Sequence, residues 1–239
     1  MKGTYLIAEH IVELHSLYPY VHNQCAGYRY NGINAPDIRI RTVQADIDSE
    51  QRRSDGTEYP DDYLESLAVY RRFAEAVLED GYLLLHASAI SVDHMAYLFA
   101  ARSGTGKSTH TKLWMEYFGE RALMINDDKP VVKVCSGGRP SIVFGTPWDG
   151  KHRRSANTAV TLKAICFLNR GTENTVVKMD SGQAYPLLLQ QCLRVSDKRR
   201  MEITLKLLDQ LAAGAAMYRL ECNMKLSAAA AAYEGMQPL

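Results

Sequence analysis

The sequence has 239 residues, with 28 Lys and Arg against 27 Asp and Glu and a formal net charge of +1. This balance argues against a strongly basic nucleic-acid-binding protein, so no nucleic-acid partner is expected. Hydrophobic residues make up 46% and charged residues 23%, as in an ordinary globular protein rather than a disordered chain. At about 150 residues per domain, this length allows one large domain or two small ones.

The cysteines and the N-terminal segment indicate a cytoplasmic protein. The five cysteines are odd in number and form no CxxC pair, so neither a disulfide framework nor a zinc ribbon is expected. Residues 1–15 carry charges close to every apolar stretch, so no signal peptide is expected. No segment approaches the roughly 20 apolar residues that span a bilayer, and no membrane span is expected.

The N-terminal part of the chain is expected to be rich in β-structure. Polar and apolar residues alternate over 37–41, which is typical of a strand, and short strands are predicted across residues 1–45. The polar segment 46–60 predicts an exposed loop or linker. Residues 61–80 carry apolar side chains at helical spacing and precede Gly81, so they predict a helix.

The centre of the chain is more apolar and predicts strands around one glycine-bearing loop. Residues 82–92 and 95–101 predict a hairpin that leads into this loop, and residues 107–118 predict the helix that follows it. Further strands are expected at residues 122–126, 131–135, 141–144, 162–168 and 175–179. Strands mixed with helices and hairpins favour an α/β fold with a mixed β-sheet and flanking helices over an all-parallel sheet.

We expect one domain over residues 1–239 rather than two. It would consist of a β-rich part at about 1–60, a nucleotide-binding core at about 82–170 and a helical part at about 181–239. The helical part is predicted to contain one short strand near 218–222. A single domain is expected because the apolar strands on both sides of the glycine-bearing loop fit one mixed sheet.

The glycine-bearing loop fits the phosphate-binding pattern known as the P-loop or Walker A motif. Residues 101–109, ARSGTGKST, match GxxxxGK followed by Ser or Thr, except that alanine replaces the first glycine. Gly104 and Gly106 let successive backbone N–H groups point at an anion, and the helix N-terminus adds partial positive charge. Lys107 would reach the β- and γ-phosphates, and the Ser108 hydroxyl would coordinate Mg²⁺. A glycine-rich turn before an ordinary helix is the alternative.

The loop is therefore expected to bind a nucleoside triphosphate, with ATP and Mg²⁺ as cofactors. The candidate cofactor-binding residues are Ser103, Gly104, Thr105, Gly106, Lys107, Ser108 and Thr109. Lys107 is also a candidate catalytic residue, because a cation at this position neutralises charge on the transferred phosphoryl group.

A pair of carboxylates follows the predicted strand at 122–126. Asp127 and Asp128 lie about 20 residues after Lys107, and carboxylates at the C-terminal end of a strand can face a bound nucleotide. One carboxylate can take a proton from an attacking hydroxyl while the other binds the metal directly or through water. A solvated turn before Pro130 is the alternative.

Three segments together resemble the catalytic core of HPr kinase/phosphorylase, whose fold is shared with phosphoenolpyruvate carboxykinase. They are His86-Ala87-Ser88, the stretch AYLFAARSGTGKST, and INDD at 125–128. This resemblance covers about residues 82–130. Residues 145–171 and the tail LDQLAAGAAMYRLECN are similar to small HPr-kinase-like proteins, and that similarity runs along nearly the whole chain. The resemblance implies an HPr-kinase-like fold and makes a homo-oligomer reasonable.

The resemblance also implies roles for the residues of the site. Asp127 would be the general base, and Ser108 and Asp128 would hold the metal. His86 would lie near the transferred phosphoryl group, with a histidine hydrogen-bonded inside the core as the alternative. The chain is far shorter than a phosphoenolpyruvate carboxykinase, so decarboxylation is not expected. We find no C-terminal signature of the phosphorylase activity, which argues against HPr as the substrate.

A dense basic run at residues 150–154 follows the turn-rich stretch 145–148, which comes after the predicted strand at 141–144. An Arg can stabilise the charge that spreads over a transferred phosphoryl group, and Arg is well suited to bidentate contact with phosphate. Lys151 and Arg153 are the candidate members of the site, and Arg153 is taken as a catalytic candidate. A solvated basic loop is the alternative.

These features predict an ATP-dependent kinase that transfers the γ-phosphoryl group to a hydroxyl. The acceptor would be Ser or Thr of a protein or peptide, or a small molecule, and no readable code identifies it. One alternative is a P-loop ATPase that drives a transporter or an assembly, although Lys129 stands where such an enzyme would carry a Glu to activate water. The other alternative is a nucleotide-binding regulatory or peptide-maturation module without phosphotransfer.

Overall fold

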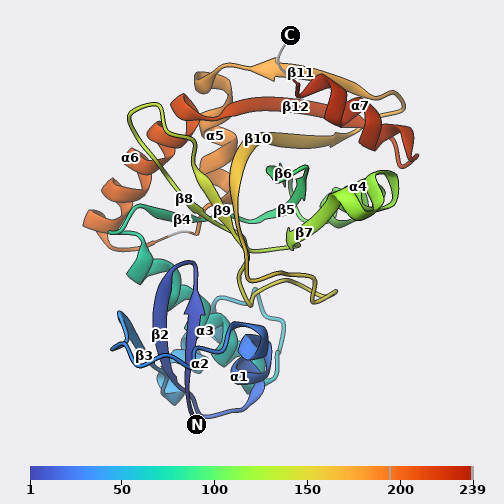
Figure 1. The fold of residues 1–239 in the computed structure, drawn as a ribbon. Helices are drawn as coiled ribbons and strands as arrows, with labels where there is room; N and C mark the ends of the chain where they lie inside the picture. The colour runs from blue at the N-terminus through green and yellow to red at the C-terminus, as the bar shows by residue number, and fades with distance from the viewer. Residues whose placement is uncertain (194, 238–239) are drawn as a thin grey trace.

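The computed structural model describes residues 1–193 and 195–237, which form a mixed α/β structure (Figure 1). A three-stranded sheet belongs to the N-terminal part of the chain and a nine-stranded sheet to the remainder. The N-terminal elements, in chain order, are β1 (Lys2–Ile7), β2 (His10–His15), α1 (Tyr20–Gln24), the 3₁₀ helix η1 (Cys25–Tyr28), β3 (Ile38–Arg41), α2 (Gln44–Arg52) and α3 (Asp61–Val77).

The larger sheet and its helices follow α3. In chain order these elements are β4 (Tyr82–Leu84), β5 (Ala87–Val92), β6 (Met95–Ala100), α4 (Lys107–Phe118), the 3₁₀ helix η2 (Gly119–Arg121), β7 (Ala122–Asn126), β8 (Val131–Lys133), β9 (Ile142–Phe144), β10 (Ala159–Arg170), β11 (Thr175–Met179), α5 (Ser181–Gln191), α6 (Lys198–Gly214), β12 (Ala216–Cys222) and α7 (Ser227–Gly235). The strands pair both parallel and antiparallel, which confirms the predicted mixed sheet. No helix along the described residues has the length and apolar character needed to cross a bilayer.

Strand β10 organises the larger sheet, because it pairs with three strands along its length. Its first residues pair antiparallel with β9, its middle pairs in parallel with β6, and its last residues pair in parallel with β12. The carboxyl ends of parallel strands lie at one edge of a sheet. The loop that follows β6 therefore emerges beside the end of β10, at Arg170.

Helices cover both faces of the larger sheet. Side chains of a strand point alternately to the two faces, and consecutive residues of β6 are buried, so both faces must be covered. Leu98 points to one face and packs in a cluster with Leu188 of α5 and Leu208 of α6. Phe99 points to the other face and packs with Trp114 of α4, in the cluster that also holds alanines of α7. Burial on both faces fixes β6 and its neighbours as the rigid support of the loop that follows.

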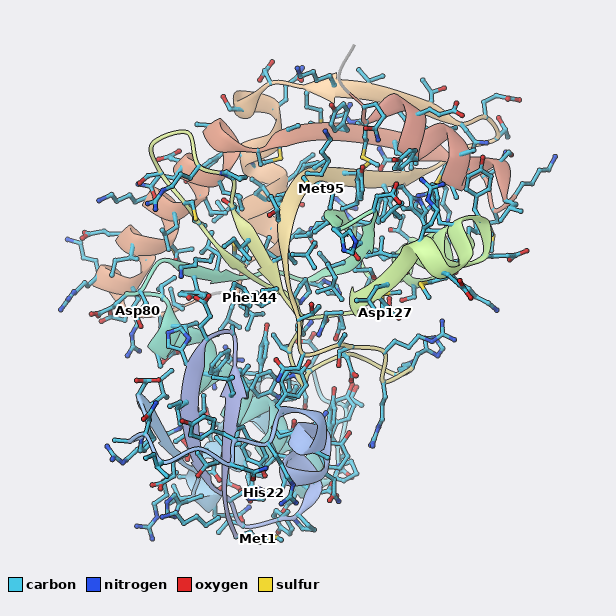
Figure 2. The ribbon with its side chains drawn as sticks, viewed as in Figure 1. Met1, His22, Asp80, Met95, Asp127 and Phe144 are labelled. Atoms are coloured by element: carbon cyan, nitrogen blue, oxygen red, sulfur yellow. The ribbon has the colours of Figure 1, made fainter. Side chains whose placement is uncertain are left out.

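A third apolar cluster joins the N-terminal sheet to the larger one. It contains Val12 of β2, Phe73 of α3, Phe144 of β9, and Trp148 beyond β9. The indole N–H of Trp148 also donates to the carbonyl of Ser66 on α3, at 3.1 Å. Figure 2 shows Phe144 at the side of the larger sheet that faces the N-terminal part. This packing brings α3 against the larger sheet, while the prediction of a single domain stays a prediction.

The N-terminal part is less β-rich than predicted. The segment 46–60 was expected to be an exposed loop, but residues Gln44–Arg52 form helix α2. The Asp46 carboxylate accepts a hydrogen bond from the backbone N–H of Val43 at 2.9 Å and closes the first turn. Arg71 of α3 binds Glu50 at 2.6 Å, and this tertiary contact stabilises a helix whose composition alone is too polar to indicate one.

Two further predictions need correction. Short strands were expected across residues 1–45, but Tyr20–Gln24 and Cys25–Tyr28 are helical, and the burial of Val21 and Cys25 explains why. Residues 82–92 were expected to form one strand, but the strand is interrupted between β4 and β5. The helices at 61–77 and 107–118 confirm their predictions.

Gly145 is a position where the fold permits no side chain. A Cβ there would lie 1.9 Å from the carbonyl oxygen of Ala156 and 2.6 Å from that of Ile125. Both atoms belong to the backbone, so Gly145→Ala should lower the free energy of unfolding by about 2 kcal/mol or more. Urea denaturation measures this loss. Gly27→Ala is the control, because a Cβ at Gly27 meets nothing within 4 Å, and equal midpoints for the two variants would contradict the prediction.

Candidate functional site

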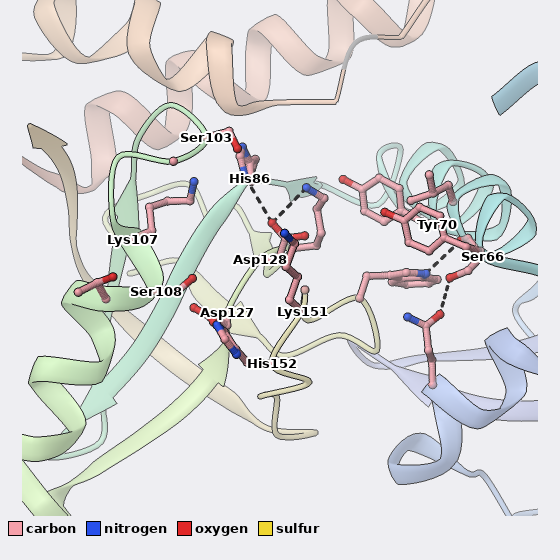
Figure 3. Close-up of a pocket in the computed structure, with 18 of the residues that line it drawn as sticks. Ser66, Tyr70, His86, Ser103, Lys107, Ser108, Asp127, Asp128, Lys151 and His152 are labelled. Carbon is pink, nitrogen blue, oxygen red and sulfur yellow. Dashed lines mark hydrogen bonds and ion pairs between the residues drawn. The ribbon is translucent and has the colours of Figure 1, made fainter. Parts of the chain in front are cut away.

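A cavity of about 580 Å³ lies between the loop after β6, the Asp pair after β7 and helices α1 and α3 (Figure 3). On the side of the larger sheet it is lined by His86, Ser103, Gly104, Gly106, Lys107, Ser108, Thr109, Asp127, Asp128, Lys129, Trp148, Gly150, Lys151 and His152. On the side of the N-terminal part it is lined by Tyr20, Gln24, Tyr63, Ser66, Leu67 and Tyr70. The cavity therefore collects most of the residues that the sequence singled out.

The loop between β6 and α4 has the backbone shape that its glycines predict. Gly104 has φ +77° and Gly106 has φ +120°, conformations that L side chains rarely adopt. A Cβ at either position would meet nothing within 4 Å, so backbone conformation rather than space requires glycine. Gly106 directly precedes α4. The first N–H groups of α4 have no acceptor within the helix and, with the helix dipole, favour an anion at this end.

Lys107 is a buried cation at the start of the helix that follows the loop. Its side chain lies at the start of α4 with the residue only 8% exposed, and its ammonium donates to the carbonyl of Ala101 at 3.1 Å. It forms no ion pair with any carboxylate among the described residues. Burial lowers the pKa of Lys107, and the nearby charges of Asp128 and Asp127 oppose that shift. Because an unpaired buried charge is costly, this arrangement favours an anionic ligand.

Arg170 supports the loop from behind, and sequence analysis did not single it out. Its guanidinium donates to the carbonyl of Gly104 at 2.6 Å and to the carbonyl of Thr105 at 3.1 Å. These bonds hold two loop carbonyls away from the cavity. Only the parallel register of β10 with β6, which places the end of β10 at the loop, could have indicated this contact. Thr105 itself does not line the cavity.

Asp127 is buried between hydroxyl groups. Its carboxylate accepts a hydrogen bond from Ser88 at 2.9 Å, and Figure 3 shows Ser108 beside it. Burial raises the pKa of Asp127, while the hydroxyls of Ser88 and Ser108 lower it in part. A carboxylate with a raised pKa is a better proton acceptor near neutral pH than an ordinary one.

Asp128 has the opposite surroundings. Its Oδ1 lies 3.3 Å from Nε2 of His86 and 3.4 Å from Nζ of Lys129. Burial acts to raise the pKa of Asp128, but the hydrogen bond from His86 and the charge of Lys129 outweigh it, so the pKa is lowered. His86 is thus at the cavity and not sealed in the core. Its contact with Asp128 is the reason it belongs to the site.

The turn that carries the Asp pair is shaped by Asn126. This side chain is fully buried, and its Oδ1 accepts the backbone N–H groups of Asp128 at 2.9 Å and Lys129 at 2.6 Å. Its amide nitrogen donates to the carbonyl of Thr146 at 2.9 Å. The Asp pair therefore does lie in a turn, and this turn orients the two carboxylates of the site.

The basic run brings one of its two candidate residues, Lys151, to the cavity, together with His152 in place of Arg153. A Cβ on Gly150 would lie 3.1 Å from Cβ of Asp128, so the run passes close to the Asp pair. Lys151 and His152 line the cavity. Arg153 does not line it, and its guanidinium lies 5.7 Å from the centre of the Tyr20 ring, facing a neighbouring hollow.

The described residues contain no group of three or more His, Cys, Asp or Glu side chains that could hold a metal ion. Mg²⁺ differs from metals that need such a cage, because it binds through one or two carboxylates together with substrate phosphates and water. The donors present, a hydroxyl on Ser108 and carboxylates on Asp127 and Asp128, fit that pattern. Any Mg²⁺ here would depend on a nucleotide for part of its coordination.

Comparison with known proteins gives little further information. No family model matches the chain, and no curated protein matches its sequence. Among solved structures, the chain is similar to the HPr(Ser) kinase/phosphatase from Coxiella burnetii, with 13% sequence identity and a TM-score of 0.26. This similarity covers 52% of the present chain and 87% of the other. The chemistry of the site therefore rests on its own geometry.

The two carboxylates of the pair should affect stability in opposite directions. The pKa of Asp127 is raised in the folded protein, so its anion destabilises the fold above that pKa, and Asp127→Asn should raise the melting temperature at about pH 7. The gain should shrink as the pH falls toward about 3.9, the pKa of an unfolded Asp.

Asp128→Asn is the matched variant. The pKa of Asp128 is lowered, so its anion stabilises the fold above the unfolded pKa, and Asp128→Asn should lower the melting temperature at about pH 7. This loss should also shrink as the pH falls through the folded pKa. Thermal unfolding followed by circular dichroism over this pH range measures both variants, and shifts of the same sign would contradict the assignment.

Arg170 should control the order of the loop. Removing its two hydrogen bonds by Arg170→Met should make opening of residues 103–106 easier by about 1 kcal/mol, or about fivefold in amide exchange rate. Hydrogen exchange mass spectrometry measures this change. Arg219→Met, on the neighbouring strand β12, is the control that leaves these bonds in place. Unchanged exchange in the loop of Arg170→Met would show that Arg170 does not hold it.

Proposed function

We propose that the protein is an ATP-dependent, Mg²⁺-requiring kinase with an HPr-kinase-like fold, which transfers the γ-phosphoryl group to a hydroxyl. The observation that carries this proposal is Lys107, a buried ammonium at the N-terminus of α4 that has no ion pair within the part of the chain that the structure describes. A triphosphate in the loop would give this ammonium its counter-charge. The loop around Gly104 and Gly106, whose positive φ angles glycine adopts without strain, would supply backbone N–H groups to the same ligand.

The Asp pair supports phosphoryl transfer rather than binding alone. Asp127, with its raised pKa, would accept the proton of the acceptor hydroxyl. The freed oxygen would then attack the γ-phosphorus, and the bond to the bridging oxygen would break with its electron pair leaving on ADP. Ser108 and Asp128 would hold Mg²⁺, which neutralises charge on the β- and γ-phosphates. Asp128 suits this role because its lowered pKa keeps it anionic.

An exchange of the two carboxylate roles is the internal alternative. Asp127 lies beside Ser108 (Figure 3), so it is well placed to share a metal with that hydroxyl. Asp128 would then accept the acceptor proton, with His86 at 3.3 Å to orient its carboxylate. Both assignments use the same residues and predict the same overall reaction.

A kinase fits the cavity better than an ATPase does. Lys129 follows the Asp pair, and its ammonium lies 3.4 Å from Asp128, so a general base dedicated to water is missing at that position. The cavity also continues from the loop to α1 and α3. Space for a second substrate beside the phosphates is what transfer to an acceptor requires.

Transfer of labelled γ-phosphate from ATP tests the proposal. The protein is incubated with Mg²⁺ and a mixture of hydroxyl compounds and Ser/Thr peptides, and a labelled product is expected. Asp127→Asn should reduce its formation about 100-fold or more, and Lys107→Ala should weaken ATP binding at least about tenfold. Lys112→Ala, an exposed lysine of the same helix, is the control.

Other outcomes of this assay identify the alternatives. Release of labelled inorganic phosphate at a rate independent of the mixture would indicate an ATPase, and ATP binding without turnover would indicate a regulatory module. Full activity of Asp127→Asn together with a raised Mg²⁺ requirement would assign the base to Asp128 instead. Normal ATP binding by Lys107→Ala would contradict the proposed phosphate site.

A further inference from the structure

The wall of the cavity contributed by the N-terminal part carries no charged side chain. Its members are phenols, an amide, a hydroxyl and one leucine, and they are Tyr20, Gln24, Tyr63, Ser66, Leu67 and Tyr70. The opposite wall differs sharply, because it holds Lys107, Asp127 and Asp128. The cavity therefore has a charged side suited to phosphates and metal and a neutral side suited to something else.

The neutral wall is held in place by contacts between α1, α3 and Trp148. The Ser66 hydroxyl donates to the side-chain carbonyl of Gln24, so the NH₂ of Gln24 is left to donate to a ligand. Trp148 donates to the backbone of Ser66 at 3.1 Å, and its ring lies 5.5 Å from that of Tyr70. The rings of Tyr20 and Tyr63 meet edge to face at 6.3 Å. Contacts within the protein therefore fix the positions of these side chains.

The phenols of this wall lie opposite the Asp pair. Burial raises the pKa of Tyr70, and the charge of Asp128 adds to that shift. The pKa of Tyr63 is also raised, mainly by burial and to a smaller extent by Tyr59 and Asp128. Figure 3 shows Tyr70 and Ser66 on one side of the cavity and Lys107, Ser108 and Asp127 on the other, with Asp128 between them. A group seated against Tyr63 and Tyr70 would therefore be next to the catalytic carboxylates.

We propose that this neutral wall is the acceptor subsite and that it takes an uncharged alcohol. The inference rests on the proposed kinase function. A carboxylate on the acceptor would find no free cation among the described residues at this wall, because Lys129, whose Nζ lies 6.0 Å from the centre of the Tyr70 ring, is paired with Asp128, and Arg153 over Tyr20 does not line the cavity. An ammonium would find only the carboxylates of the Asp pair, which phosphoryl transfer requires, so burying either charge against this wall would be costly. Phenol hydroxyls and the Gln24 amide can instead pair with neutral hydroxyl and amide groups, while the tyrosine rings cover their apolar parts.

Two sources share this chemistry. One is a neutral polyol, and the other is a serine or threonine inside a peptide, where the backbone charges of the free amino acid are absent. In both, the alcohol loses its proton to a carboxylate of the Asp pair. Its oxygen forms the new bond to the γ-phosphorus, and ADP leaves with the electron pair of the broken bond.

A panel of matched probes tests the charge of the acceptor. Myo-inositol and N-acetylserinamide are the neutral compounds, and free serine and glycerate are charged compounds with a comparable hydroxyl. We expect labelled γ-phosphate in at least one neutral compound, with kcat/KM at least about tenfold above that of either charged one, which corresponds to about 1.4 kcal/mol. Whether the inositol or the N-acetylserinamide is labelled distinguishes the polyol from the peptide source.

Two variants test the wall itself. Tyr63→Phe removes one hydroxyl and keeps the ring, and Gln24→Glu keeps an oxygen for Ser66 but replaces the free NH₂ by a negative charge. Each should raise KM for the neutral acceptor about three- to tenfold and leave KM for ATP unchanged. Tyr59→Phe is the control, because the Tyr59 ring lies tilted against that of Tyr63, 5.4 Å between centroids, but does not line the cavity.

The outcomes separate this inference from the proposed function. Labelling of free serine or glycerate at the rate of the neutral compounds would support a kinase and overturn the neutral subsite. ATP binding that depends on Lys107, without labelling of any neutral compound, would also overturn it. Unchanged acceptor KM in both Tyr63→Phe and Gln24→Glu would remove the wall from the acceptor site. Failure of ATP to bind at all would instead contradict the kinase.

Discussion

The packing of Trp148 between the two sheets is the interaction on which the site depends. Trp148 lies in the chain between β9 and β10 of the larger sheet. Its ring is nevertheless 5.5 Å from that of Phe73, and its N–H donates to the carbonyl of Ser66, both on α3. This contact sets the distance between α3 and the Asp pair, and so the width of the cavity. The same segment continues through Gly150, which passes against Asp128. One buried aromatic residue thus positions a neutral wall and a basic loop around the same two carboxylates.

The electrostatics of the site follow from unequal surroundings of adjacent residues. Asp127 is enclosed with hydroxyls as its neighbours, so burial dominates and raises its pKa. Asp128 is also withdrawn from water, but His86 and Lys129 outweigh burial and lower its pKa. Two carboxylates whose pKa values are pushed apart can serve as proton acceptor and as permanent anion at one pH. Asn126 makes this possible, because its side chain fixes the turn in which the two residues face different partners.

The parts of the site that could be predicted from the sequence are those formed by residues close together in the chain. The glycines and Lys107 could be found because a phosphate loop is one short segment, and Asp127 because it follows an apolar strand. Arg170 could not be found, because only strand register brings it to the loop. The wall that includes Tyr63 was missed for a similar reason: its helix is predictable, but the surface it faces depends on Trp148. Arg153 was predicted wrongly as a site residue, because a series of consecutive basic residues does not indicate which of its side chains points into the cavity.

The interruption between β4 and β5 explains how polar residues of a buried sheet reach the cavity. Segments 82–92 and 122–133 run antiparallel, with β4 paired to β8 and β5 to β7. Between these pairs the backbone bonds continue, from Leu85 to Pro130 and from Ala87 to Asp128, but the regular strands are broken. His86 and the Asp pair lie at this break, where His86 bonds instead to the carbonyl of Gln191. A continuous strand would turn alternate side chains into the core on either face. Because the regular strands are interrupted here, His86 and Asp128 instead contact each other at the cavity. The flanking strand pairs still hold their backbone rigid.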